Sequence, residues 1–367
     1  MKRLCLFLAA LALTLAPPAV FGDPLTSIGS MFRNRPNHSG YYDDRGVTDV
    51  RDVLWKARAD GEIVSTPAIW AGVVYVGSDD DHLYAINAHT GVTTWRFRAE
   101  DDISSSPAKA GDFVFFGCED EYFYALDKDT GLEKWRFKTE GNVLSSPVVE
   151  NDVVYFGSND DFLYAVEAAT GMEKWRFKTE GDVRSSPAVA GGIVFFGSMD
   201  DHIYAVDAAT GIEKWRFATE GGVHSSPAVV DNVIYFGSDD GCLYALDART
   251  GMSKWRFEAG EKIRSSPAVS GGLVFIGCDN GVLYAVDAKT GASSWQQTTG
   301  DAVSSSPAVA GGVVYIGSDD GGLYAFTAVD GAPLWVYRTE DTVRSSPAVR
   351  DGLVVFGSSD GFLYGLK

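Results

Sequence analysis

A repeat of 40 residues without insertions runs through almost the whole chain. Tyrosine recurs with this period from Tyr84 to Tyr364, and proline recurs from Pro67 to Pro347. Tryptophan follows the same spacing at Trp55, Trp95, Trp135, Trp175, Trp215, Trp255, Trp295 and Trp335. A period of this length is typical of propellers and solenoids, so one supersecondary unit, repeated eight times, must build the fold.

Each unit contains four short runs of β-favouring residues separated by turn residues. In one unit these runs predict strands over 185–189, 193–197, 203–207 and 213–219. Four strands joined by short connections are typical of an antiparallel blade, and the aromatic and β-branched runs exclude a helical repeat. The sequence therefore predicts an all-β fold, an eight-bladed β-propeller.

The two ends of the repeat region complement each other. The last unit supplies runs over 345–349, 353–357 and 362–366, and the sequence then stops at Lys367 before a fourth run. The first tryptophan, Trp55, lies in a fourth run that has no preceding three. We expect the N-terminal strand around Trp55 to complete the last blade, which closes the ring and removes a long exposed sheet edge.

The first residues have the pattern of a secretory signal peptide. Lys2 and Arg3 precede an apolar run over 4–16, and a small residue, Gly22, precedes Asp23. The run is shorter than the ~20 residues of a membrane span, and Cys5 lies too early to be a lipidated residue at the cleavage site. We expect a signal peptide over 1–22, an N-terminal extension over 23–50 and the propeller over 51–367. The protein is then exported to the periplasm or beyond, with no transmembrane segment.

Charge and metal-binding patterns narrow the function further. The net charge is −19, and removal of Lys2 and Arg3 makes it −21, which repels nucleic acid. The histidines have no metal-ligand spacing, and the acidic turns at 79–81 and 119–121 lack the alternating ligands of a calcium loop, so we expect solvated turns and no metal. Three cysteines remain in the mature chain as buried or half-buried thiols, with a disulfide between two of them as the alternative: Cys118, Cys242 and Cys278.

The spacing Ala, Gly and Trp within each unit resembles the family of β-propellers built from pyrroloquinoline quinone (PQQ)-type repeats. The pattern begins at Ala85, Gly91 and Trp95 and recurs in register to Trp335, and the resemblance covers residues 31–367. The flat indoles can stack on the glycine turns of neighbouring blades and donate their N–H to backbone carbonyls. The eight lattice tryptophans are thus structural docking residues.

The resemblance implies two different functions. Secreted members include the propeller accessory component of the outer-membrane β-barrel assembly machinery, which implies a non-catalytic scaffold, monomeric here, that binds protein or peptide partners in the cell envelope. The alternative is a small PQQ-dependent quinoprotein dehydrogenase or other envelope enzyme. Quinoprotein dehydrogenases are longer and carry an adjacent cysteine pair and insertions that this chain lacks. We therefore expect no catalytic residue and no cofactor.

Function in a repeat protein should lie where the repeats differ. The position before the serine pair of the innermost run varies as Val64, Ser104, Leu144, Arg184, His224, Arg264, Ser304 and Arg344. We predict that Arg184, His224, Arg264 and Arg344 form an electropositive channel mouth that binds carboxylates, with His224 adding pH dependence. The alternative is that each arginine pairs with an acidic turn on the same face.

A second varying position lies beside the acidic turns. It carries His82, Tyr122, Phe162, His202, Cys242, Val282, Gly322 and Phe362. These side chains could extend the same face as a peptide-binding surface, with core packing as the alternative.

Overall fold

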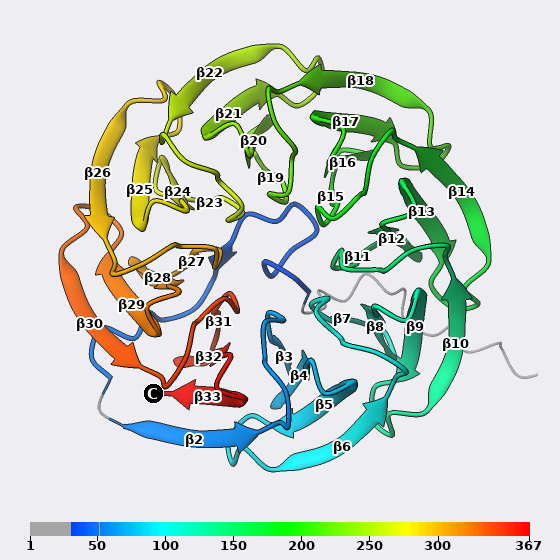
Figure 1. Ribbon diagram of the computed structural model, residues 1–367, viewed down its shortest axis with the longest axis horizontal. Coiled ribbons are helices and arrows are strands. Elements are labelled where there is room, and N and C mark those ends of the chain that lie inside the picture. The colour runs from blue at the N-terminus through cyan, green and yellow to red at the C-terminus, as the bar shows by residue number, and fades with distance from the viewer. Residues whose placement is uncertain (1–30, 51) are drawn as a thin grey trace, which may run out of the picture.

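Eight antiparallel sheets surround a central axis in the computed structural model, which describes residues 31–50 and 52–367 (Figure 1). The described residues form strands and turns without a helix, so the predicted eight-bladed β-propeller is confirmed. In this part of the chain no helix is long and apolar enough to cross a membrane. The predicted signal peptide, 1–22, lies outside the described residues.

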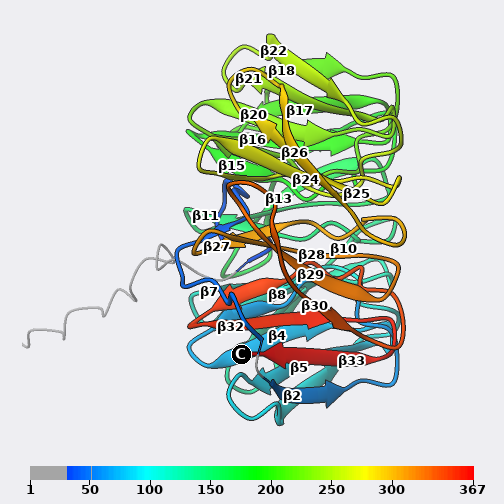
Figure 2. The same ribbon diagram turned by 90° about the vertical axis from the view of Figure 1, so that its left-hand side faces the viewer.

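Each blade runs from an inner strand at the axis to an outer strand at the perimeter of the ring. The side view shows the depth of this ring (Figure 2). The inner strands are β3 (Ala68–Trp70), β7 (Ala108–Ala110), β11 (Val148–Glu150), β15 (Ala188–Ala190), β19 (Ala228–Val230), β23 (Ala268–Ser270), β27 (Ala308–Ala310) and β31 (Ala348–Arg350). We number the blades 1 to 8 in this order.

The second strands are β4 (Val73–Gly77), β8 (Phe113–Gly117), β12 (Val153–Gly157), β16 (Ile193–Ser198), β20 (Val233–Gly237), β24 (Leu273–Gly277), β28 (Val313–Gly317) and β32 (Leu353–Gly357). The third strands are β5 (His82–Asn87), β9 (Tyr122–Asp127), β13 (Phe162–Glu167), β17 (His202–Asp207), β21 (Cys242–Asp247), β25 (Val282–Asp287), β29 (Gly322–Thr327) and β33 (Phe362–Leu366). The outer strands are β6 (Thr93–Arg98), β10 (Glu133–Lys138), β14 (Glu173–Lys178), β18 (Glu213–Ala218), β22 (Ser253–Glu258), β26 (Ser293–Thr298), β30 (Pro333–Arg338) and, for blade 8, β2 (Val53–Arg58).

The predicted inner strand was wrong in its extent. The sequence predicts a strand over 185–189, but β15 covers only Ala188–Ala190, because Pro187 has no N–H for a sheet ladder. The serine pair bonds the next blade instead: Ser185 Oγ donates to the Ser225 carbonyl at 3.1 Å, and Ser186 N donates to Ser226 Oγ at 2.9 Å. The other three predicted strands of this blade differ from the observed ones by one residue each.

The serine pairs therefore link the blades around the axis. The backbone N–H to Oγ bond recurs at 40-residue intervals from Thr66 N to Ser106 Oγ through Ser306 N to Ser346 Oγ. Ser345 Oγ donates to the Ser65 carbonyl at 2.8 Å and joins blade 8 to blade 1. A repeated serine thus has a structural role in this fold.

The closure predicted from the chain ends is confirmed. β2 pairs antiparallel with β33, with Trp55 opposite Gly365 and Lys56 opposite Tyr364. Figure 1 shows the two strands, blue and red, side by side in blade 8. The chain ends therefore leave no unpaired strand at this junction.

The docking role of the tryptophans is also confirmed. Trp95 Nε1 donates to the Lys128 carbonyl of the next blade at 3.1 Å, and its ring covers Gly131. A Cβ on Gly131 would lie 2.5 Å from Trp95 Cε3, and the backbone there has φ +69°. Six more indoles make the same bond to the residue 33 positions later. Glycine is needed at this turn because the indole leaves no room for a Cβ and because the backbone has a positive φ.

Residues 31–42, which we call the plug segment, cross the centre of the ring on one face (Figure 1). The carbonyls of four plug residues accept N–H bonds of 2.7–2.9 Å from the inner strands of blades 4 to 7: Pro36 from Val189, Asn37 from Val229, Ser39 from Val269 and Gly40 from Val309. The plug segment ends in β1 (Tyr41–Tyr42), which pairs in parallel with β27. We call this side the plug face and the opposite side the mouth face.

Candidate functional site

The mouth face carries the connections that enter the inner strands and the turns between second and third strands. Arg184, Arg264 and Arg344 lie in these connections, four residues before β15, β23 and β31. Their side chains are 37%, 45% and 52% exposed. They come from alternate blades, 4, 6 and 8, so they are spread along more than half of the ring.

All three arginines are in ion pairs with aspartates. Arg184 Nη2 lies 2.7 Å from Asp182 Oδ2 in its own connection. Arg264 lies 3.8 Å from Asp239 and 3.4 Å from Asp279, and Arg344 lies 3.2 Å from Asp319. The last three aspartates belong to turns between second and third strands, so the predicted pairing with acidic turns is found for Arg264 and Arg344. Their charges are partly neutralised within the protein.

His224 lies in blade 5, between Arg184 of blade 4 and Arg264 of blade 6, and is half-buried. Burial lowers its pKa, Arg184, Arg264 and Lys262 lower it further, and Asp239 opposes them. The imidazole is therefore neutral at pH 7. The pH at which His224 becomes charged therefore lies below the ordinary histidine pKa of ~6.5.

Blades 1 and 2 contribute a group of carboxylates to the mouth face that sequence reasoning missed. We call Glu62, Asp79, Asp102 and Glu119 the acidic arc. Burial and repulsion from the other three raise the pKa of Asp79 to about 7, although a hydrogen bond from Ser104 opposes the shift. The pKa of Asp102 is raised for similar reasons. The sequence could have indicated this acidic group, because blades 1 and 2 have no lysine or arginine at the positions where blades 4, 6 and 8 have arginine.

The rim formed by these positions is therefore not uniformly electropositive. We define the mouth rim as three positions in each blade. In blade 1 these are Glu62 and Val64, which flank Ile63 just before the position of the serine pair, and Asp79, the first residue of the acidic turn. The other blades contribute the equivalent positions at intervals of 40 residues. These positions hold eight carboxylates and four lysine or arginine side chains in total. Among the described residues, the rim carboxylates of blades 1 and 2 form no close ion pair, although Arg344 of blade 8 interacts electrostatically with Glu62. Blades 4, 6 and 8 carry the arginines.

The middle residues of the acidic turns have a structural role, which corrects the prediction that they are only solvated. Tyr84 donates its hydroxyl to Asp80 Oδ2 at 2.6 Å, and Asp80 also accepts from the backbone N–H of Asp60 and His82. The same tyrosine–aspartate bond recurs in six other blades. The repeated tyrosine is thus the partner of the turn.

The acidic turns also bring three carboxylates together. Single oxygens of Asp81, Asp101 and Asp102 lie within 4.8 Å of one another. Because exposed carboxylates often cluster at a turn-rich surface, this grouping by itself does not define a metal site.

The second varying position provides platforms for cations of the outer strands. Tyr122 lies under Arg136 and Lys138, at 4.7 and 4.5 Å from the ring centroid, and Phe162 lies under Arg176 at 5.1 Å. These rings are half-buried and already covered. This geometry favours packing over the predicted peptide-binding surface.

The three cysteines of the described residues, Cys118, Cys242 and Cys278, are free and buried. Burial raises the pKa values of the thiols of Cys118, Cys242 and Cys278. The expected buried thiols are therefore found, and the alternative disulfide is absent among the described residues.

One departure from the repeat on the plug face was also missed. Lys109 occupies an inner-strand position at which the other seven blades have valine or isoleucine. Its side chain is 3% exposed, and Nζ lies 4.3 Å from the ring centroid of Trp70, the one tryptophan outside the 40-residue spacing. Arg350 approaches the same ring at 5.9 Å.

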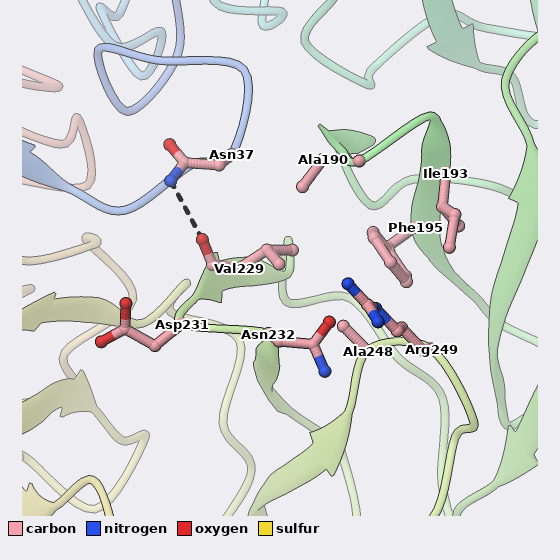
Figure 3. A pocket seen from close by; sticks show the side chains of 10 residues that line it. Asn37, Ala190, Ile193, Phe195, Val229, Asp231, Asn232, Ala248 and Arg249 are labelled. Carbon is pink, nitrogen blue, oxygen red and sulfur yellow. Dashed lines mark hydrogen bonds between the residues drawn. The ribbon is translucent and has the colours of Figure 1, made fainter.

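A cavity of about 260 Å³ opens between blades 4 and 5 on the plug face (Figure 3). Phe195 and Ile193 form an apolar wall, and Asp231 and Arg249 contribute charged groups. Asn37 of the plug segment borders it and donates Nδ2 to the Val229 carbonyl at 3.0 Å. The cavity lies on the face opposite the predicted mouth.

Comparison with protein families gives a match along the repeat region. The model of the family described as outer membrane protein assembly factor BamB, a PQQ-type repeat family, matches residues 51–121, 99–186, 159–263 and 239–367. The chain belongs to this family. A search of curated protein sequences found no match.

Solved structures of several kinds share the fold. BamB from Moraxella catarrhalis is 20% identical, with a TM-score of 0.76 over 86% of this chain and 99% of that one. The computationally designed Ika8 protein is 17% identical, with a TM-score of 0.78 over 86% and 99%. A europium-containing methanol dehydrogenase is 16% identical, with a TM-score of 0.81 over 92% of each chain. At these identities the likeness shows the fold alone.

The residues of the mouth rim do not fit PQQ. The quinone is a planar tricarboxylate, and a site for it needs more cations than carboxylates and a flat ring to stack on. The rim carries more carboxylates than cations, and its arginines pair with aspartates. No tryptophan, tyrosine or phenylalanine occurs at the 24 rim positions. We therefore derive no chemical step through this cofactor.

Proposed function

We propose that this protein is an exported, non-catalytic propeller that binds a protein or peptide partner of the cell envelope at its mouth rim. The observation that carries the proposal is the separation of charge in the rim, with the acidic arc on blades 1 and 2 and the arginines on blades 4, 6 and 8. Membership of the BamB family supports a role in outer-membrane protein assembly.

Charge complementarity indicates what the partner would offer. A segment that crosses the rim would present basic groups to the acidic arc and carboxylates to the arginines. Because the aspartate pairs are partly exposed, a partner carboxylate can exchange with or join them at low cost. Bidentate guanidinium–carboxylate geometry would then fix the orientation of the partner.

The rigidity of the ring supports a scaffold. Blades are tied at the axis by the serine bonds and at the outer strands by the tryptophan bonds. The rim positions are therefore held in fixed places before a partner arrives, which lowers the entropic cost of binding.

Site-specific photo-crosslinking in the host tests the proposed surface. A photoreactive residue at Ser304, an uncharged rim position, should give a discrete adduct with an envelope protein. The same residue at Lys289, exposed on the plug face, is the control. Adducts of equal yield from both positions, or from Lys289 alone, would contradict the proposal.

Mass spectrometry of the exported protein should find its N-terminus near Asp23.

A further inference from the structure

An arginine is buried at the centre of the propeller without an acidic partner among the described residues. Arg33 of the plug segment is 3% exposed. Its Nε donates to the His38 carbonyl at 3.4 Å, and Nη2 donates to the Pro267 carbonyl. Within residues 31–50 and 52–367 it has no ion pair; Tyr42 and His38 interact with it electrostatically, and its Cζ lies 5.9 Å from the centroid of the Phe32 ring. A guanidinium has five N–H donors, so this cation is incompletely satisfied.

The backbone around Arg33 is shaped to hold the guanidinium in this position. Gly40 has φ +64°, and a Cβ there would lie 2.1 Å from Arg33 Nη2 and 2.8 Å from the Ala268 Cβ. Arg33 itself has φ 58°, a strained conformation for a residue with a side chain. The position of the buried guanidinium thus depends on a glycine at position 40 and on a strained backbone at Arg33.

A small cavity of about 10 Å³ lies against Arg33. Thr66, Ser306 and Ser346 line it from blades 1, 7 and 8, and all three side chains are buried. Ser306 Oγ and Ser346 Oγ each accept a backbone N–H from the preceding blade. Within the part of the chain that the structure describes, none of the three hydroxyls donates a hydrogen bond.

We propose that this cavity binds a monatomic anion such as chloride. Its polar lining consists of the partly satisfied Arg33 guanidinium, the Tyr42 side chain and three hydroxyls that donate no hydrogen bond within the described residues, and no carboxylate borders it. Burying an uncompensated charge is strongly unfavourable, so an anion supplies what the site lacks. The volume is close to that of one water-sized sphere, which favours a monatomic anion over sulfate, phosphate or a carboxylate.

The anion would link the plug segment to the ring. Arg33 belongs to the plug, whereas Thr66, Ser306 and Ser346 belong to three blades. A ligand that binds only when these parts are assembled stabilises the folded protein more as its concentration rises above the dissociation constant. Halide should therefore raise the melting temperature specifically.

Thermal unfolding of the mature chain in halide-free buffer tests this. At constant ionic strength, replacing sodium gluconate with sodium chloride or bromide should raise the melting temperature roughly with the logarithm of the halide concentration above the dissociation constant. Arg33→Met should abolish the dependence, and Arg35→Met, an exposed arginine in the same segment, should retain it. Equal melting temperatures of the unaltered chain in gluconate and chloride would overturn the proposal.

Crystals soaked in bromide provide a second readout that does not depend on a variant folding. An anomalous peak beside Arg33, Thr66 and Ser346 is the expected result. Anomalous density absent from that position, with only a water there, would overturn the proposal even if chloride raised the melting temperature through other surface sites.

Discussion

Trp335 donates its indole N–H to the carbonyl of Val47 at 2.9 Å, across 288 residues of sequence. The other seven lattice tryptophans donate to the residue 33 positions later, which for Trp335 would lie past Lys367. Val47 also exchanges hydrogen bonds with the Tyr315 hydroxyl. The N-terminal extension thus replaces the missing part of the repeat beside blade 7, while β2 completes blade 8.

Two deletions should separate the contributions of the extension and the closing strand. Removal of 23–50 takes away the plug segment and the Val47 acceptor but keeps β2, so the ring should still close with a lower melting temperature. Removal of 23–60 also exposes the edge of β33 and should cause aggregation. Size-exclusion chromatography and thermal unfolding measure both. A 23–60 deletion that stays monomeric and melts like the full chain would contradict the closure described here.

The glycine turns under the tryptophans can be tested with a matched pair. Gly131→Ala adds a Cβ 2.5 Å from Trp95 at φ +69°, whereas Gly191→Ala at φ +59° meets no atom within 4 Å. The control should lose about 1 kcal/mol of unfolding free energy from backbone strain. Gly131→Ala should lose about 3 kcal/mol or more, because overpacking adds to the strain. Denaturant unfolding gives both values, and equal losses would show that tryptophan docking does not require the glycine.

Asp79 should make the protein less stable as pH rises. Its pKa is about 7 in the folded state and near the ordinary 3.8 when unfolded. Between these values the folded state holds the extra proton, so unfolding free energy falls as pH rises from 4 to 7 and stays reduced above it. Asp79→Asn should raise stability at pH 8 by about 1 kcal/mol, because solvent limits the effect of a half-buried group. Melting curves at pH 5 and 8 measure this, and a variant that loses as much stability at both would refute the repulsion within the acidic arc.

The rim predicts that PQQ does not bind. Adding PQQ with Ca²⁺ to the protein should leave the absorbance of the quinone unshifted and should give no dye-linked alcohol oxidation, because the rim carries more carboxylates than cations and has no aromatic platform. A red-shifted spectrum with alcohol oxidation would instead support the quinoprotein alternative.

The regular part of the fold was predictable because each repeated residue has one local or adjacent-blade partner. Trp95 and Gly131 meet in neighbouring units, so a fixed spacing indicates their contact. Pro187 and the serine pair were misinterpreted as strand because their bonds run to the next blade and not along a ladder. The partner of Trp335 lies outside the repeat, so periodicity could not indicate it.

The candidate site was predictable in position more than in charge. Departures from the repeat indicated Arg184, Arg264 and Arg344, which lie in connections on the same face of the ring but in three separate blades. Their net effect depends on Asp182, Asp279 and Asp319, which come from different turns, and only side-chain geometry shows which carboxylates they meet. The plug segment has no repeat at all, so its path along blades 4 to 7 could not be read from spacing.

The proposed function depends on the rim arginines as a binding surface, and one comparison tests this most directly. The triple variant Arg184→Gln, Arg264→Gln and Arg344→Gln removes the same charge as Arg136→Gln, Arg176→Gln and Arg216→Gln on the outer strands, where each arginine pairs with a glutamate. Each rim pair is partly exposed, so stability should change by at most about 1 kcal/mol per pair. Photo-crosslinking from Ser304 should lose its envelope adduct in the rim variant and keep it in the outer-strand variant. An adduct of unchanged yield in the rim variant, with stability reduced, would show that these arginines serve only as counter-ions to the aspartates.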